Sequence, residues 1–151
     1  MDTGDEKLFY FAYGSNMDPE QMKERQAKFF SRKGAVLRGW QLVFNVESKT
    51  WKCGVANIVE KEAAKVEGVL YEITKNSLDE LDRYEGFPRK YQRKLLSVES
   101  EGKEYKAEVY ISKENKDGLK PSKRYLKQLL KGQDVLSKEY VEMLRKVETQ
   151  D

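Results

Sequence analysis

The sequence predicts an α+β fold: a small, mostly antiparallel β-barrel of six strands surrounded by helices. Three observations support it. Six segments rich in Val, Ile, Tyr and Phe are bounded by turn residues, four other segments have helical patterns, and the middle strands follow one another without helices between them. Because few helices are present to cover the edges of such a sheet, we expect it to curl or close.

The first predicted strand, residues 8–12, is a short aromatic and apolar run. A helix over residues 19–26 should follow, because Asp18 can accept hydrogen bonds at the N-cap and Pro19 suits the first helical position. Gln21 stands where a capping box places its reciprocal partner. A short turn therefore separates this strand from the helix.

The middle of the chain predicts a run of strands and then one helix. The strands are expected over residues 35–46, 54–59 and 65–73. The helix, residues 78–84, has a capping box of Ser77 and Glu80 and should end near Gly86. Pro88 prevents its continuation, because proline lacks the N–H that the helix requires.

The last third of the chain predicts a hairpin followed by helices. Strands over residues 91–99 and 105–111 are joined by a Glu-Gly-Lys turn at residues 101–103. Helices are predicted over residues 123–130 and 138–147. Ser137 is placed to cap the second of these helices.

A basic run covers residues 116–131, with six positive side chains and one negative. Its apolar residues fall at helical spacing: Tyr125, Leu126, Leu129 and Leu130. The cations are therefore interpreted as the solvated face of an amphipathic helix. The alternative is a nucleic-acid site, for which affinity would fall steeply with salt. The net charge of +3 is too small to imply such a partner, and we expect none.

The composition bounds the fold and the location. A chain of 151 residues, 38% hydrophobic and 36% charged, has the size and surface of one globular domain. We expect that domain over residues 8–148, with tails at residues 1–7 and 149–151. No apolar stretch approaches the roughly 20 residues that span a bilayer, and the N-terminus lacks the regions of a signal peptide. A cytoplasmic protein without a membrane partner is expected.

The chain contains no histidine and one cysteine. The usual zinc sites, Ser-His-Asp triads and Cys-His pairs are therefore excluded. Cys53 lies in a strand-like segment and is interpreted as a small core residue. Catalysis, if present, must come from a carboxylate, lysine, tyrosine, serine, the lone cysteine or the backbone.

A Gly-Ser-Asn turn at residues 14–16 lies where the first strand ends and the first helix begins. Such a turn offers backbone N–H groups without internal partners, and the helix dipole adds partial positive charge, so an anion would bind there. The alternative is that Gly14 and Asn16 are ordinary turn residues that tolerate positive φ.

Glu85 stands at the end of the predicted helix 78–84. The negative end of the helix dipole disfavours a carboxylate there. If Tyr84, Phe87 and Tyr91 enclosed it in a partly dry pocket, its pKa would rise toward the value that a general base near neutral pH requires. The alternative is a solvated glutamate at a frayed helix end.

The run FYFAYGSNM (residues 9–17), with YEGF near mid-chain, resembles the gamma-glutamylcyclotransferase family, also described as AIG2-like. Further similarities are GVANIV at 54–59, EGVLYEI at 67–73, YQRKLLSV at 91–98, and Pro121-Ser122 followed by Tyr125. They extend over residues 8 to about 145. The resemblance implies a small closed β-barrel with helices around it.

The resemblance also implies a site and a reaction. Glu85 would be the catalytic base, and the residues expected to bind substrate are Tyr13, Gly14, Ser15, Asn16, Met17, Tyr91 and Tyr125. Tyr91 and Tyr125 would orient a small γ-glutamyl substrate through their hydroxyls, or else be core aromatics. The implied reaction cyclises the γ-glutamyl group to 5-oxoproline without metal or cofactor. The protein would be a monomer or homodimer.

The leaving group stays open at this point. The YQR segment is closer to the branch of the family that acts on γ-glutamyl-amines, including γ-glutamyl-lysine isopeptides, whereas YGSNM is closer to the branch that acts on γ-glutamyl-amino acids. A third alternative is a non-catalytic relative that binds a small carboxylate or a partner protein in the same pocket.

Overall fold

The computed structural model describes residues 6–151. Its elements are β1 (Lys7–Ala12), the 3-10 helix η2 (Ser15–Met17), α1 (Pro19–Glu24), β2 (Phe29–Ser48), β3 (Cys53–Thr74), α2 (Lys75–Glu85), β4 (Gln92–Ser100), β5 (Lys103–Ile111), α3 (Lys123–Leu129), the 3-10 helix η3 (Leu130–Val135) and α4 (Lys138–Arg145). The strands form a closed barrel in the order β1-β3-β2-β4-β5. Neighbours are antiparallel except β1 and β5, which pair in parallel. The predicted α+β barrel is confirmed.

Within the described residues the barrel has five strands, not the six predicted. The predicted strands 54–59 and 65–73 are parts of one strand, β3, which pairs with β2 along its length. Residues 60–63 between them are exposed, Ala63 has a φ of 67°, and the register against β2 shifts at this level. The charged stretch around residue 62 is therefore an irregularity inside a strand rather than a loop.

The helix ends depart from the prediction where a side chain has a better partner elsewhere. α2 begins at Lys75, because the Thr74 hydroxyl accepts the Ser77 N–H at 3.1 Å. The Ser77 hydroxyl instead donates to the carbonyl of Lys28 at 3.0 Å, so the predicted capping box is wrong. α1 ends at Glu24, two residues early, and Gln26 has a φ of 62°.

Two predicted N-caps are confirmed. The Asp18 carboxylate accepts the Glu20 N–H at 3.0 Å, and the Ser137 hydroxyl accepts the Tyr140 N–H at 3.1 Å. Gln21, however, does not close a capping box onto Asp18. Its amide donates to the Ser15 hydroxyl and thereby reaches back to the turn before the helix.

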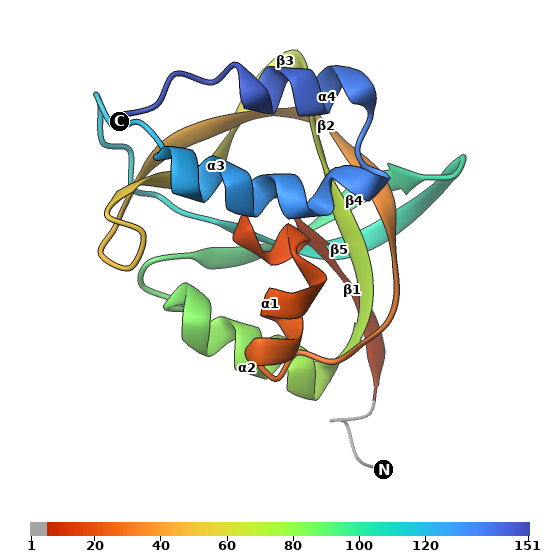
Figure 1. The fold of residues 1–151 in the computed structure, drawn as a ribbon. Coiled ribbons are helices and arrows are strands. Elements are labelled where there is room, and N and C mark those ends of the chain that lie inside the picture. The colour runs from red at the N-terminus through yellow and green to blue at the C-terminus, as the bar shows by residue number, and fades with distance from the viewer. Residues whose placement is uncertain (1–5) are drawn as a thin grey trace.

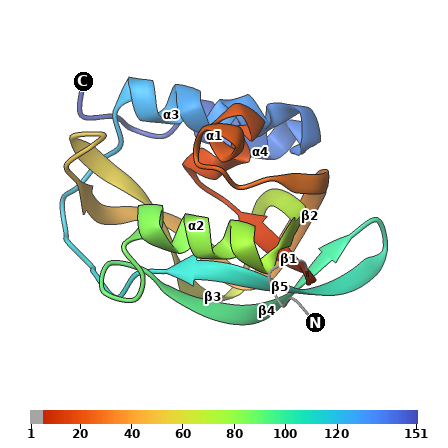
Figure 2. The ribbon, with the colours of Figure 1, turned by 90° about the horizontal axis from the view of Figure 1, so that it is seen from below.

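The helices lie in a row on one side of the barrel, with α1 between α3 and α2 (Figure 1). The view from below shows the same order, and the β4–β5 hairpin extends beyond the barrel at its turn (Figure 2). Cations of α3 face solvent while Tyr125, Leu126 and Leu129 are buried, which confirms the amphipathic interpretation. Cys53 is buried as predicted.

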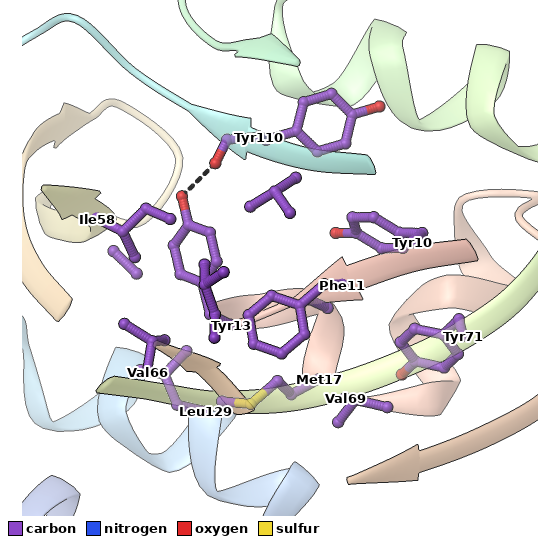
Figure 3. Packing of buried hydrophobic residues seen from close by; sticks show 14 of the residues in the cluster. Tyr10, Phe11, Tyr13, Met17, Ile58, Val66, Val69, Tyr71, Tyr110 and Leu129 are labelled. Carbon is purple, nitrogen blue, oxygen red and sulfur yellow. Dashed lines mark hydrogen bonds between the residues drawn. The ribbon is translucent and has the colours of Figure 1, made fainter. Parts of the chain in front are cut away.

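The barrel interior is filled by aromatic and branched side chains (Figure 3). Tyr10 of β1 stacks on Tyr71 of β3 with ring centroids 6.1 Å apart, and Tyr110 of β5 meets Tyr10 edge to face at 5.7 Å. Such pairs stabilise a core beyond the area that they bury. This packing fixes the end of β1, from which the turn departs.

The chain ends are only partly comparable with the predicted tails. Residues 1–5 of the predicted N-terminal tail lie outside the described residues, and Lys7 already pairs with Thr74 in the sheet. At the other end, the Gln150 N–H donates to the carbonyl of Pro121 at 3.0 Å. Of the helices in residues 6–151, none is long and apolar enough to cross a membrane.

Candidate active site

The Gly-Ser-Asn turn and Glu85 line the same cavity, which has a volume of about 320 Å³. The two are far apart in sequence, but the Asn16 amide nitrogen lies 3.5 Å from a Glu85 carboxylate oxygen and donates to it. Strand and helix lengths explain the meeting. β3 ends beside the start of β1, and α2 then returns over 11 residues, about 16 Å, nearly the length of the six-residue β1. The end of α2 therefore reaches the end of β1.

The turn consists of Gly14 and the 3-10 helix η2, and Gly14 is not in the left-handed conformation. Gly14 has a φ of −118°, so the suggested positive φ is not what requires glycine here. A Cβ on Gly14 would lie 3.3 Å from the Tyr125 hydroxyl oxygen and 3.4 Å from the Ala56 Cβ, so this backbone borders the cavity closely. Within residues 6–151, the N–H groups of Gly14, Ser15 and Asn16 have no acceptor. The predicted set of free donors is thus present.

Three side chains hold the carbonyl groups of η2 from other elements. The Gln128 amide of α3 donates to the Ser15 carbonyl at 3.2 Å. The Tyr71 hydroxyl of β3 donates to the Asn16 carbonyl at 2.7 Å, and the Arg32 guanidinium of β2 donates to the Met17 carbonyl at 3.2 Å. Because each carbonyl is fixed, the N–H groups of the turn are fixed as well.

Met17 is the one predicted substrate-binding residue that does not line the cavity. Its side chain is fully buried in the core. A Cβ on Gly132 of η3 would lie 2.7 Å from the Met17 Cβ, so these two backbones pack directly on each other. The structure therefore places Met17 as packing beneath the turn, while Tyr13, Gly14, Ser15 and Asn16 line the cavity.

Glu85 is the last residue of α2, and Gly86 follows it in the left-handed conformation. The side chain is 19% exposed. Burial raises its pKa to about 7, the nearby Arg25 guanidinium opposes that rise, and the Asp82 carboxylate adds to it. The solvated alternative is therefore not what the structure shows.

The aromatic enclosure of Glu85 differs from the one expected. Tyr84 is 53% exposed and Phe87 is also exposed, so neither shields the carboxylate as predicted. Tyr84 instead stacks under the Arg25 guanidinium, 4.9 Å from its carbon. Buried residues near Glu85 include Tyr10 of β1 and Tyr91, the residue just before β4.

Tyr91 and Tyr125 are anchored to the same backbone unit of β3. The Tyr91 hydroxyl donates to the Ala56 carbonyl at 2.9 Å, and the Tyr125 hydroxyl accepts the Ala56 N–H at 3.0 Å. Burial raises the pKa of both tyrosines, so both stay protonated. The Tyr125 hydroxyl therefore keeps a hydrogen for a ligand in the cavity, whereas the Tyr91 hydroxyl has already used its own.

Tyr13 is the third tyrosine predicted to bind substrate. Figure 3 shows its hydroxyl pointing to the carbonyl oxygen of Tyr110, to which it donates at 2.5 Å. Its donor is therefore occupied, and its ring forms part of the cavity wall.

Sequence reasoning missed several cavity residues, among them Tyr10, Arg25 and Trp51. Arg25 is the C-cap that follows α1, where a cation is ordinarily interpreted as a partner of the helix dipole. Tyr10 reads as a core aromatic of β1, and Trp51 lies in the turn between β2 and β3. No local pattern distinguishes these residues from structural ones, because their roles arise only from contacts between distant elements.

Comparison with known proteins identifies the family of the chain. Residues 10–128 match the family described as gamma-glutamyl cyclotransferase, AIG2-like. The chain is 32% identical to gamma-glutamylcyclotransferase of Homo sapiens, over 97% of this chain and 82% of that protein, and 32% identical to the protein of the same name from Bos taurus, over 97% and 81%. A solved gamma-glutamyl cyclotransferase structure superposes with a TM-score of 0.88 at 31% identity, covering 97% of this chain and 90% of that one. The chain belongs to the AIG2-like gamma-glutamyl cyclotransferase family.

Proposed function

We propose that this protein is a γ-glutamylcyclotransferase, which converts a γ-glutamyl amide to 5-oxoproline and releases the attached amino acid or amine. The observation that carries the proposal is the 3.5 Å contact between Asn16 of the turn and the Glu85 carboxylate inside one cavity. A base whose pKa is about 7 thereby lies beside free backbone donors. The names of the human and bovine relatives agree with this activity.

The proposed reaction is intramolecular. The substrate's own α-amine attacks its γ-carbonyl carbon, the new C–N bond closes a five-membered ring, and the original amide C–N bond breaks. The α-ammonium loses two protons on becoming the ring N–H, and the leaving nitrogen gains two on departing as an ammonium. Glu85 takes one proton from the α-ammonium and delivers it to the leaving nitrogen, the second is exchanged with solvent, and no water is consumed. Holding the folded conformer of the substrate supplies on the order of several kcal/mol.

The turn would bind the anionic part of the substrate. The free N–H groups of Gly14, Ser15 and Asn16 can hold the α-carboxylate or the oxyanion that forms at the γ-carbonyl. A donor aimed at such an oxyanion is worth roughly 3 kcal/mol. The Tyr125 hydroxyl, which accepts from Ala56, has its hydrogen left for the glutamyl moiety. Tyr91 supports Tyr125 through their shared anchor on β3.

The proposal is tested by measuring 5-oxoproline release from γ-glutamyl-amino acids, glutathione and γ-glutamyl-ε-lysine. Release from any of them supports the activity. If none is cyclised while a γ-glutamyl compound still binds, the protein is the non-catalytic relative that shares the pocket. The cytoplasmic location and the monomeric or homodimeric state stay predictions from the sequence.

The charge of the cavity favours γ-glutamyl-amino acids as substrates. Its lining includes the cations Arg25, Lys49, Arg83 and Lys90, and Glu85 is its one acid among the described residues. Lys49, Arg83 and Lys90 are exposed, so they lie toward solvent, where a leaving group would depart. A leaving group with a carboxylate is attracted there, whereas a cationic amine is repelled.

We expect γ-glutamyl-alanine to be cyclised with a kcat/KM about tenfold above that of γ-glutamyl-ethylamine, since several exposed cations each give some tenths of a kcal/mol. The two substrates differ only in the carboxylate. The preference should shrink as salt is raised from 0.05 to about 0.5 M, because salt screens exposed charges. Equal kcat/KM values at low salt would instead favour the γ-glutamyl-amine branch.

Gly14→Ala tests whether the backbone of the turn at residues 14–16 binds the substrate. The φ of −118° is open to alanine, but the ψ of −138° lies outside the β region, and the added methyl would lie 3.3 Å from the Tyr125 hydroxyl oxygen, so the substrate loses close approach and the fold loses some stability. We expect KM to rise about tenfold, or about 1.4 kcal/mol, with a loss in the free energy of unfolding of about 1–3 kcal/mol. Steady-state kinetics and thermal unfolding measure both. Unaltered KM and kcat would count against substrate binding at the turn.

A further inference from the structure

Arg25 is a cavity residue for which the proposed reaction gives no role. It is the C-cap residue that follows α1, and its side chain is 18% exposed. The guanidinium has three neighbours from two elements: the Asn16 side chain of η2, and the Glu85 carboxylate and the Tyr84 ring of α2. It therefore joins the two halves of the site, the turn and the base.

The contacts of Arg25 determine which way the Asn16 amide faces. The amide oxygen of Asn16 accepts from the Arg25 Nη1 at 3.0 Å and from the Gln21 Nε2 at 2.9 Å. With two donors on the oxygen, the amide nitrogen must face the opposite way. It donates to the Tyr10 hydroxyl at 3.0 Å and to Glu85 Oε1 at 3.5 Å. Losing Arg25 removes one of the two contacts that enforce this orientation.

Arg25 also bears on the carboxylate directly. Its Nη1 lies 3.9 Å from Glu85 Oε1, the same oxygen that receives the Asn16 amide. Glu85 Oε2 has no hydrogen-bond partner within residues 6–151. One carboxylate oxygen is thus held by the protein, and the other is left for a ligand.

We propose that Arg25 is a positioning residue: it holds the Asn16 amide and Glu85 Oε1 so that Oε2 faces the substrate α-amine. This proposal rests on the proposed cyclotransferase activity for its kinetic consequence only. The contacts among Arg25, Asn16 and Glu85 exist in the protein without substrate, so they are also measurable without turnover.

The charges around Glu85 define what the loss of Arg25 should do. Arg25 of α1 is the largest charge effect on Glu85 and favours the ionised form. Asp82 on the same helix opposes it, and Lys90 beyond the helix assists it. The tyrosines that also face the carboxylate stay neutral: Tyr10, Tyr13, Tyr91, Tyr110 and Tyr125. Without Arg25, Glu85 should bind its proton more tightly.

Arg25→Met and Arg25→Lys separate charge from geometry. For Arg25→Met we expect kcat to fall about 10²-fold at high pH through misplacement, and the acid limb of the kcat/KM profile to move to higher pH by about one pH unit. Arg25→Lys keeps the positive charge but not the planar set of N–H donors of a guanidinium. The acid limb of the kcat/KM profile should therefore stay at the same pH while kcat still falls. Lys23→Met, which removes an exposed cation from the same helix, is the matched control.

The readout without turnover is a carbon-detected NMR titration of the Glu85 carboxylate in wild type and both variants. An upward move of its midpoint in Arg25→Met, absent in Lys23→Met, supports the proposal even if no 5-oxoproline is ever released, in which case only the cyclotransferase activity fails. An unmoved midpoint and acid limb, with kcat within about twofold of wild type, would overturn it. Arg25→Lys, which keeps the stacking on Tyr84, serves if Arg25→Met does not fold.

Discussion

Glu85→Gln is expected to remove nearly all 5-oxoproline release and, above neutral pH, to make the protein more stable. The glutamine side chain has the same size, and its oxygen can still accept from Asn16, but it cannot take a proton from the substrate amine. Loss of a general base ordinarily costs 10²–10⁴-fold, and we expect a fall in kcat of about 10³-fold. Single-turnover product release measures it.

The stability change follows from the same burial that raises the pKa. Glu85 has a pKa of about 7 in the folded protein against an ordinary 4.5. Below pH 4.5 both states are protonated and no stability is lost. Between pH 4.5 and 7 the unfolded chain gives up its proton while the folded protein keeps it, so wild-type stability falls as the pH rises. Above pH 7 the accumulated loss is about 3 kcal/mol.

Glutamine does not ionise, so Glu85→Gln escapes that loss. Denaturant unfolding at pH 4, 6 and 8 should show a difference from wild type that is small at pH 4 and about 3 kcal/mol at pH 8. Glu80→Gln, on the same helix and paired with Arg83 at the surface, is the control for the substitution itself. Full activity in Glu85→Gln would refute the assignment of the base. If Glu85→Gln and wild type have the same free energy of unfolding at all three pH values, the pKa of Glu85 is not raised in the folded protein.

Such a pair of effects is characteristic of a carboxylate kept for chemistry. A buried acid that destabilises the fold at working pH is ordinarily replaced unless a function retains it. A non-catalytic relative would gain stability by losing Glu85 and would lose nothing. Joint measurement of activity and stability in one variant therefore distinguishes an enzyme from a binder that shares its pocket.

Local sequence patterns predicted the structure correctly where neighbouring residues in the chain determine the conformation. The cap at Asp18, the stop at Gly86 and the turn at residues 101–103 follow from backbone chemistry within a few residues, and the structure has all three. The predictions were wrong where a contact with a residue distant in sequence determines the conformation. Ser77 was expected to cap α2, but the carbonyl of Lys28 from another segment takes its hydroxyl. The sequence predicts two separate strands, 54–59 and 65–73, but pairing with β2 makes them one strand with an irregularity near Ala63.

The site shows the same division. The sequence places Glu85 at a helix end and the turn at a strand end, yet periodicity does not say that they meet. Their meeting depends on the antiparallel pairing of β1 with β3 and the matching length of α2. Family resemblance supplied that contact. It did not supply the depth of Met17 or the exposure of Tyr84, because a motif records residue types and not the surface that each one covers.

The second large effect concerns Asp82, one helical turn before Glu85. Its carboxylate accepts from the Arg93 guanidinium at 2.8 and 3.2 Å and from the Tyr110 hydroxyl at 2.6 Å, and it is 16% exposed. Arg93 retains one other acid, Glu108 at 3.4 Å. The network joins α2 to β4 and β5, and so fixes the helix whose last residue is the proposed base.

Asp82→Leu is expected to destabilise the protein by about 3–5 kcal/mol, because it leaves a largely buried guanidinium short of a partner. Asp82→Asn keeps an acceptor for Tyr110 and should cost only about 1–2 kcal/mol. Asp79→Asn is the control on the same helix: its pair with Lys75 is about half exposed and should be worth less than about 0.5 kcal/mol. Denaturant unfolding at one pH ranks the three. Similar losses for Asp82→Leu and Asp79→Asn would show that the network does not anchor α2.

Asp82 also links this anchor to the chemistry, with a sign opposite to that of Arg25. Its negative charge raises the pKa of Glu85, so Asp82→Asn should lower that pKa and move the acid limb of kcat/KM to lower pH. Arg25→Met should move the same limb to higher pH. Because the two residues carry opposite charges, general loosening of the site would move both profiles in the same direction, whereas the two charges act on Glu85 in opposite directions. Opposite movements require that Glu85 is the group being titrated.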